Sequence, residues 1–421
     1  MVSVPGFFFL AMAGFAGQTR AGLDLEYVTV LYRHGDRSAV DAYPTDPYQE
    51  SAWPQGFGQL SQVGMMQQYD LGRFLRKRYG GFLNQTYKRN EILVHSTDYD
   101  RTLMSAESNL AGLYPPSGQQ VFNPNLKWQP IPVHSIPKDL EKILSYPMAN
   151  CPRFQQLFNE TKQTEEFKNI SKEYQDVVDL VRRNTGLNDS TVDSVWGVYD
   201  TLFCESRHNM TLPNWVTPKV MEDLKFLKDY GFQITFGGYK HLEKSRLQGG
   251  TLLGEIVKNL TAISKSKAEN KLKMMMLSAH DTTVASLQGS LNVFNGLQPP
   301  YASCHMIELL KDENGSFFVS MFYRNDSTKD PFPLQIPGCA FACPLEDFFK
   351  ITKPSIPEDR VKECQLPSHT TDKGVLIILT VSSCLLLLLI VILLSILCYQ
   401  SKPKISHRYS HVINQEPGDE S

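Results

Sequence analysis

VLYRHGDR, at residues 30–37, is an apolar run that ends in two arginines, a histidine and an aspartate. It continues a segment, LEYVTVLY at residues 25–32, whose β-branched and aromatic residues predict a β-strand. Arg33, His34 and Arg37 therefore stand where that strand ends. An isolated Arg-His pair is most often part of a solvated basic turn, so the rest of the chain decides what this octet means.

Two later segments, EILVH (residues 91–95) and KMMML (residues 273–277), also read as strands, and each precedes a helical pattern. The polar residues that follow these two strands are Asp98, Asp100, Arg101, His280 and Asp281. Strands that alternate with helices predict an α/β fold with a mostly parallel sheet and helices on both faces. Ligands bind at the carboxyl ends of such strands, so the three polar clusters are expected to share one crevice.

The middle of the chain, residues 138–235, differs in composition from the rest, with many charged residues and helical periodicity. It is predicted to form a smaller helical lobe. The α/β core would then consist of residues 22–137 and 236–365.

The residues expected in the crevice suit phosphoryl transfer. Converging arginines need an anion, and their guanidinium groups fit phosphate oxygens. Neighbouring positive charge lowers the pKa of His34, which keeps the imidazole neutral and nucleophilic in acid. We expect His34 to form a phosphohistidine and Asp281 to protonate the departing alkoxide. Arg33, Arg37 and Arg101 would stabilise the transferring phosphoryl group, a task that calls for no metal ion or other cofactor.

These motifs resemble those of the histidine acid phosphatases. The family signature Arg-His-Gly-x-Arg appears at residues 33–37 and its distal His-Asp pair at residues 280–281. Similar stretches between about residues 25 and 365 are WPQGFGQL, STDYDRTLMSAESNLAGL, WQPIPVHSIP, DTLFCE and PYASCH. The resemblance implies a phosphoglycerate mutase-like fold and acid phosphatase activity. It makes His34 the nucleophile, Asp281 the proton donor, and the phosphate-binding set Arg33, Arg37, Arg101 and His280.

Both ends of the chain carry apolar segments. VSVPGFFFLAMAGFA, at residues 2–16, is too short to span a bilayer, so residues 1–20 are predicted to be a secretory signal peptide. Residues 374–398 contain neither charge nor proline and are long enough for a membrane-spanning helix.

The charges beyond the second apolar segment predict its orientation. Basic residues follow it closely, at Lys402, Lys404 and Arg408. The positive-inside rule then makes residues 399–421 a cytosolic tail and residues 21–371 a lumenal phosphatase domain of a type I single-pass protein. Asn-x-Ser/Thr sequons, the acceptors of N-linked glycan, all lie before the membrane segment, at Asn84, Asn159, Asn169, Asn188, Asn209, Asn259, Asn314 and Asn325.

Six of the eight cysteines precede the membrane segment, an even number that suits disulfides in an oxidising compartment. Sequence alone allows fifteen pairings of six cysteines. The close spacing of Cys339 and Cys343 could also indicate zinc, although no second Cys/His cluster stands nearby. The pairs implied by the family resemblance are Cys151–Cys364, Cys204–Cys304 and Cys339–Cys343.

The same resemblance implies a homodimer with Trp128 and His134 at the contact. The chain departs from it at His95, where relatives often carry arginine. In the tail, Tyr409 and Val412 fit a tyrosine-x-x-apolar sorting signal, which clathrin-adaptor type proteins can bind as an added strand. A membrane-anchored member of the family is routed by a similar signal. The expected route is therefore the secretory pathway, then the cell surface, then the lysosome.

Composition narrows the choice of function. With 42 Lys plus Arg against 44 Asp plus Glu, the chain shows no sign of a nucleic-acid-binding surface. Two alternatives to a general acid phosphatase stay open. The same scaffold could prefer an inositol phosphate or a nucleotide, which a substrate panel distinguishes. An inactive, receptor-like glycoprotein would fail to turn over p-nitrophenyl phosphate in acid.

Overall fold

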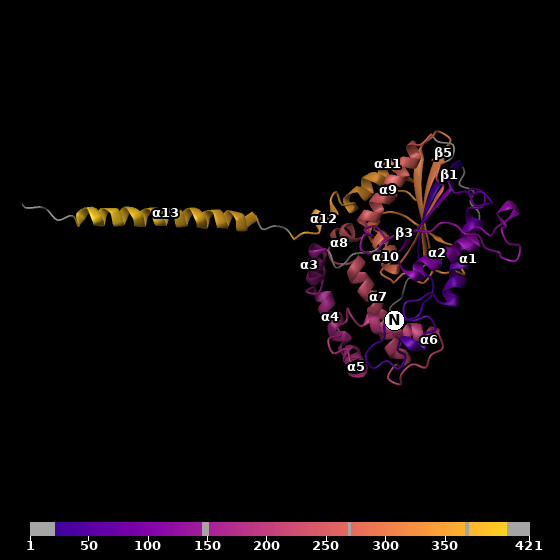
Figure 1. Cartoon of the computed structure of the whole chain (residues 1–421), viewed down its shortest axis with the longest axis horizontal. Coiled ribbons are helices and arrows are strands. Elements are labelled where there is room, and N and C mark those ends of the chain that lie inside the picture. Colours follow the sequence, from indigo (N-terminus) through magenta and orange to yellow (C-terminus); the bar gives the residue numbers. More distant parts are fainter. Residues whose placement is uncertain (1–21, 145–150, 268–270, 367–369, 402–421) are drawn as a thin grey trace, which may run out of the picture. The chain divides into compact units, whose positions relative to one another are not determined.

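The computed structural model describes residues 22–144, 151–267, 271–366 and 370–401 (Figure 1). The chain divides into two compact units, residues 1–365 and residues 366–421. The expected signal peptide and the sorting residues Tyr409 and Val412 lie outside the described residues.

A mixed, eight-stranded sheet forms the centre of the first unit, with strand order β3-β2-β4-β1-β5-β6-β7 and β8 beside β6. The strands are β1 (Leu23–Arg33), β2 (Ile92–Thr97), β3 (His134–Ile136), β4 (Met274–Ala279), β5 (Cys304–Asp312), β6 (Phe317–Arg324), β7 (Phe332–Leu334) and β8 (Cys343–Pro344). The three predicted strands are β1, β2 and β4, and they pair in parallel as expected. From β5 onward the pairing is antiparallel, which the sequence analysis did not anticipate.

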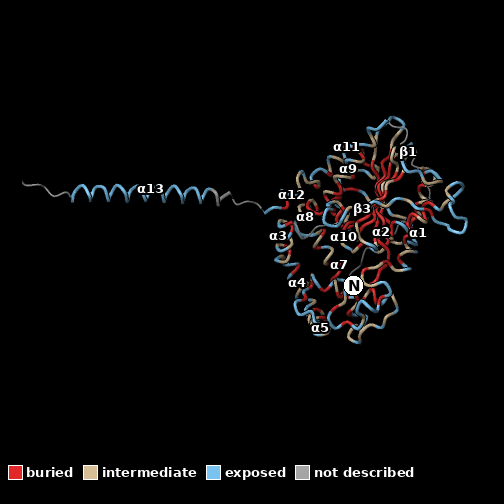
Figure 2. The backbone as a smooth tube through the Cα atoms, in the orientation of Figure 1, coloured by how far each residue is buried: buried red, intermediate tan, exposed pale blue. Residues whose placement is uncertain are grey.

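Helices cover both faces of this sheet, as predicted. The helices of the first unit are α1 (Gln62–Arg78), α2 (Asp100–Leu113), α3 (Pro152–Thr161), α4 (Glu165–Glu173), α5 (Gln175–Thr185), α6 (Trp196–Arg207), α7 (Pro218–Phe236), α8 (His241–Gln248), α9 (Gly250–Lys265), α10 (Asp281–Ser290), α11 (Leu345–Thr352) and α12 (Arg360–Glu363), with 3-10 turns η1 (Glu50–Ala52), η2 (Gly118–Gln120) and η4 (Lys353–Ser355). Alternate residues of β1 face opposite ways. Val28 and Val30 pack with α1 and α2, whereas Tyr27 and Leu31 pack with α9 and α10. Figure 2 shows the resulting buried centre.

The segment predicted to be a helical lobe contains α3 to α7. Three of these helices, α5, α6 and α7, supply most of a separate hydrophobic cluster that includes Val181, Leu202 and Leu227. Residues 1–365 nevertheless form one compact unit, so this cluster belongs to the same body as the sheet.

Within its described residues, the second unit contains one helix, α13 (Thr370–Gln400). Its segment from Gly374 to Gln400 contains a window of 18 residues with a mean hydropathy of 3.2. By length and composition this helix can cross a membrane. It coincides with the apolar segment identified in the sequence.

Two of the three implied disulfides are formed. Cys151 is bonded to Cys364 and Cys339 to Cys343, with Cα–Cα distances of 4.5 and 5.5 Å. The first bond joins the start of α3 to the end of α12, which are 213 residues apart in the chain. The second closes a short loop ahead of α11.

The third implied disulfide, between Cys204 and Cys304, is not formed, because both cysteines are buried free thiols. Cys204 extends from α6 into a small cluster with Trp53. Cys304, at the start of β5, packs instead in the cluster between the sheet and α1 and α2. The two thiols pack in different clusters of buried residues.

The sequons differ in accessibility. Asn259, on α9, is half-buried, and its Nδ2 lies 3.6 Å from the sulfur of Met275. The other sequon asparagines are exposed, namely Asn84, Asn159, Asn169, Asn188, Asn209, Asn314 and Asn325.

Candidate active site

The RHGDR loop is held in place by close backbone packing against α1. A Cβ on Gly35 would lie 2.3 Å from the carbonyl oxygen of Gly64, and one on Gly64 would lie 2.1 Å from that of Asp36. Only glycine fits at both positions. The backbone N–H of Gly35 also donates to Ser105 Oγ on α2, at 3.1 Å. The loop that carries the expected nucleophile is therefore fixed between two helices.

His34 is only 2% exposed, and its ring has a defined tautomer. Its Nδ1 lies 2.8 Å from the carbonyl oxygen of Gly35, which can only accept, so Nδ1 carries the proton and Nε2 keeps its lone pair. Burial lowers the pKa of His34 well below its usual range, and Arg33, Arg101 and Arg37 lower it further. The expected low pKa of His34 is present, but its largest single cause is burial rather than any one arginine.

Two of the three expected arginines have carboxylate partners. Arg33 Nη2 lies 2.9 Å from Asp281 Oδ2, and Arg37 Nη2 lies 3.0 Å from Asp200 Oδ1. Among the described residues, Arg101 has no carboxylate within ion-pair distance, and its Nε is buried without a hydrogen-bond partner. Burial and the charge of Arg37 lower the pKa of Arg101 to about 10. Arg101 is thus a cation that lacks an anion.

His280 and Asp281 stand at the start of α10, directly after β4. Nε2 of His280 lies 3.0 Å from Thr97 Oγ1, and burial together with Arg101 lowers the pKa of His280 to about 3. Asp281 Oδ2 accepts a hydrogen bond from Gln298 Nε2 at 2.7 Å as well as the ion pair from Arg33.

The pKa of Asp281 reflects opposing effects. Burial is the largest single effect and raises it, but Arg33, Arg37, the hydrogen bond from Gln298 and the charge of His280 together lower it below the ordinary value. Asp281 is therefore a carboxylate.

The sheet brings these residues together. β1 and β4 are in parallel register, with Arg33 opposite Ala279, so the RHGDR loop and the His-Asp pair leave the sheet side by side. A cavity of about 410 Å³ is lined by five of the six predicted residues, namely His34, Arg37, Arg101, His280 and Asp281. The sixth, Arg33, forms an ion pair with Asp281. All six predicted residues thus belong to one site.

Three residues of the site were missed from the sequence. Asp200, on α6, pairs with Arg37, and Gln298 holds Asp281. The ring of Tyr301 lies under the guanidinium groups of Arg33 and Arg37, at 4.2 and 6.0 Å from its centroid. None of the three follows a parallel strand, so the strand-end pattern could not indicate them.

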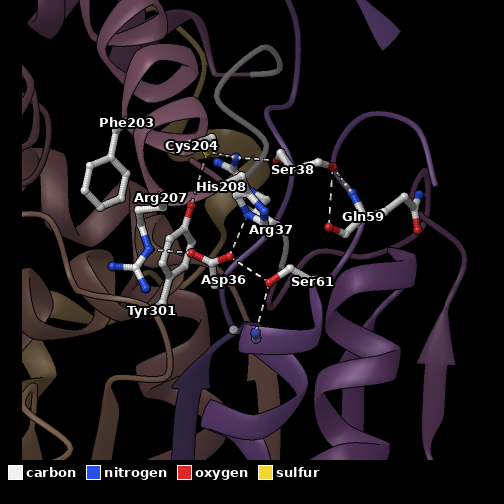
Figure 3. Close-up of polar contacts among 12 residues, drawn as sticks. Asp36, Arg37, Ser38, Gln59, Ser61, Phe203, Cys204, Arg207, His208 and Tyr301 are labelled. Carbon is white, nitrogen blue, oxygen red and sulfur yellow. Dashed lines mark hydrogen bonds and ion pairs between the residues drawn. The ribbon is translucent and has the colours of Figure 1, made fainter. Parts of the chain in front are cut away.

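Asp36, inside the RHGDR motif, has a supporting role (Figure 3). Its Oδ2 accepts from Arg207 Nε at 2.7 Å, and its Oδ1 accepts from Ser61 Oγ at 2.7 Å. His208 Nε2 lies 2.9 Å from the same Oδ1. Ser61 in turn caps α1 by accepting from the N–H of Gly64. Asp36 therefore ties the loop to the start of α1 and the end of α6.

A neutral buried histidine among arginines, with an aspartate opposite, is the arrangement expected of a phosphatase that works through histidine. The chain belongs to the histidine phosphatase superfamily (branch 2), whose family model matches residues 24–324. The resemblance to the histidine acid phosphatases is confirmed.

Its relatives include characterised phosphatases. The chain is 52% identical to lysosomal acid phosphatase of Rattus norvegicus over 393 residues, which cover 93% of this chain and 92% of the relative. It is 48% identical to prostatic acid phosphatase of Bos taurus over 354 residues, 84% of this chain and 91% of the relative. Among solved structures, it is similar to the apo form of Hafnia alvei phytase, with a TM-score of 0.61, 19% identity, and coverage of 83% of this chain and 100% of that one. This last likeness shows the fold.

Proposed function

We propose that the protein is an acid phosphatase that hydrolyses phosphate monoesters through a phosphohistidine at His34. The observation that carries the proposal is the state of that side chain. Its Nε2 keeps a lone pair because Nδ1 donates to Gly35, and the residue lines a cavity with Arg37 and Arg101. Close identity to two named acid phosphatases supports the same activity.

In the first step, the phosphoryl group binds between the arginines and provides Arg101 with the anionic partner that it lacks. Nε2 of His34 attacks phosphorus while the bond to the alcohol oxygen breaks. The positive charges stabilise the equatorial oxygens of the transferring group. Tyr301 holds Arg33 and Arg37 in position by packing beneath them.

The proton for the leaving alcohol has a definite source. Before the ester binds, Asp281 is ionised, because its pKa lies below the ordinary value. A phosphate monoester below its second pKa of about 6 still carries one proton. When the ester binds, its negative charge offsets Arg33 and Arg37, the pKa of Asp281 rises, and the proton passes to Asp281 and then to the leaving oxygen. Turnover should therefore be fastest in acid.

The second step restores the enzyme. A water molecule attacks phosphorus, the bond to Nε2 breaks, and the carboxylate of Asp281 takes the proton from that water. Asp281 passes that proton to the departing inorganic phosphate, and His34 returns to the neutral tautomer that Gly35 fixes.

The proposal is tested by p-nitrophenyl phosphate turnover near pH 5 in the presence of a chelator. Wild-type protein should remain active, and His34→Ala should lose roughly 10⁴-fold or more in kcat, the scale seen when a nucleophile is removed. A folded His34→Ala variant that keeps its turnover would contradict the covalent route.

We also infer that the phosphatase unit is lumenal and anchored by α13. The apolar helix, the disulfides and the exposed sequons support this placement. Delivery to lysosomes is supported by identity to proteins named lysosomal acid phosphatase. With adaptor recognition at Tyr409 and Val412, Tyr409→Ala should accumulate at the cell surface, measured by surface biotinylation. Unchanged surface abundance would argue against the signal.

A homodimer through the edge of the sheet is the remaining part of the proposal. β3 is the edge strand beside β2, and His134 on it is exposed. Trp128, just before β3, is 37% exposed. The phosphatase unit should sediment as a dimer, and Trp128→Glu should sediment as a monomer. A dimer that survives this substitution would place the contact elsewhere.

A further inference from the structure

The cavity is larger than a phosphoryl group and has two chemically different parts. Its inner part holds the charged residues described above. Its outer wall is apolar and comes from the helical lobe and the loop after β1, with Val40, Phe158, Trp196, Phe232 and Phe236. At about 410 Å³ the cavity has the size of a small-molecule pocket, so it has room for the leaving alcohol beside that wall.

The charges around the cavity leave little capacity for a second phosphate. Its lining carboxylates are each paired with a cation, Asp281 with Arg33, Asp200 with Arg37, and Asp193 with Lys162.

Most of the cations that line the cavity are likewise paired with carboxylates. Lys228 is paired with Asp229 at 2.8 Å. Among the described residues, this leaves Arg101 as the lining cation without a carboxylate partner. Lys138 packs on the ring of Tyr99 at 4.1 Å but does not line the cavity.

We propose that this site selects esters that carry one phosphate and an apolar, ring-bearing alcohol, and that Trp196 and Phe232 determine the selection. The inference rests on the proposed phosphatase function and names its substrate class. Trp196, at the start of α6, is 52% exposed, so its ring is available to a substrate. Phe232, one helix along on α7, is half-buried and packs on Phe236 with ring centroids 5.6 Å apart. An aromatic leaving group can stack on such rings. Further phosphates on the alcohol would find, among the described lining residues, no cation without a carboxylate partner other than Arg101.

The test compares kcat/KM at pH 5 for 2-phenylethyl phosphate, glycerol 2-phosphate and myo-inositol hexakisphosphate. The first two are esters of aliphatic alcohols with similar acidity, so the chemical step is comparable and the difference reports the pocket. We expect 2-phenylethyl phosphate to be favoured over glycerol 2-phosphate by about 10-fold, and over the hexakisphosphate by more. Equal rates for the two monophosphates, or preference for the hexakisphosphate, would overturn the inference.

Variants assign the preference to the wall. Trp196→Ala and, separately, Phe232→Leu should each lower the ratio of kcat/KM between the two monophosphates by roughly 3- to 10-fold, through a change in KM. An effect of this size corresponds to the loss of one aromatic pair. Phe122→Ala removes an exposed ring outside the cavity and should leave the ratio unchanged. An unaltered ratio in both wall variants would refute their role. Failure of the phosphatase proposal is distinguishable, because it would abolish the dependence on His34 for all three esters.

Discussion

A buried pair of acids should make the protein more stable in acid than at neutral pH. Glu205, on α6, is fully buried, and Asp46, in the loop after β1, is 5% exposed. Among the described residues, neither oxygen of Glu205 and not Oδ2 of Asp46 has a hydrogen-bond partner. Burial, with the added repulsion of Asp46, raises the pKa of Glu205 to about 8.

The sign of the effect follows from linkage. The folded protein keeps a proton on the pair that the unfolded chain releases above its ordinary pKa of 4.5. Stability from this group is therefore complete below pH 4.5 and is lost as the pH rises toward 8. Each unit inside that window is worth up to about 1.4 kcal/mol, so the rise from pH 5 to 7 costs about 2.5 kcal/mol.

The perturbation that isolates this term is Glu205→Gln, which keeps the shape of the side chain and removes its titration. A unit of about 340 residues has an unfolding entropy near 0.7 kcal/mol/K, so 2.5 kcal/mol corresponds to about 4 °C. In thermal scans at matched rates, wild-type Tm should fall by about 4 °C more than the variant's between pH 5 and pH 7. Glu107→Gln, which alters an exposed acid on α2, should track the wild type. Parallel curves for wild type and Glu205→Gln would refute the raised pKa of Glu205.

Further expectations concern the site and the thiols. Asp281→Asn should slow glycerol 2-phosphate about 100-fold more than p-nitrophenyl phosphate, because only the poor leaving group needs a proton; equal losses in kcat would argue against the acid role. Asp200→Asn leaves Arg37 buried without its counterion and should lower the free energy of unfolding by about 3 kcal/mol in urea titrations, whereas an unchanged midpoint would discount the ion pair. Alkylation of denatured, unreduced protein should label Cys204 and Cys304, and recovery of a peptide linking them would contradict their free state.

The strand ends could be predicted because local patterns determine them. β1, β2 and β4 are apolar runs followed by polar residues and a helix, and parallel pairing brings their carboxyl ends to one edge. The catalytic set therefore follows from three short segments. The antiparallel half was not predicted, because the pattern of a strand followed by a helix does not extend to β5 and β6, which follow one another directly. A signal was present there, since Asn314-Gly315 lies between the apolar runs of β5 and β6 and favours a hairpin turn.

Contacts between distant segments could not be predicted in this way. Asp200 meets Arg37 across 163 residues, and Gln298 and Tyr301 reach the site from a loop. The pairing of Cys204 with Cys304 was implied by resemblance alone, and the packing of α6 takes Cys204 toward Arg37 instead. The burial of His34 likewise results from contacts between distant segments. Sequence shows the arginines around His34, but only the folded chain shows that burial is the largest single cause of its low pKa.

The covalent step itself can be observed. Protein mixed with ³²P-labelled phosphate monoester at pH 5 and quenched in alkali within milliseconds should carry one label, which peptide mapping places on Nε2 of His34. The label should be stable in alkali, released in acid, and absent from His34→Ala. Label on another residue, or steady turnover with no trapped phosphoenzyme, would contradict attack by the imidazole.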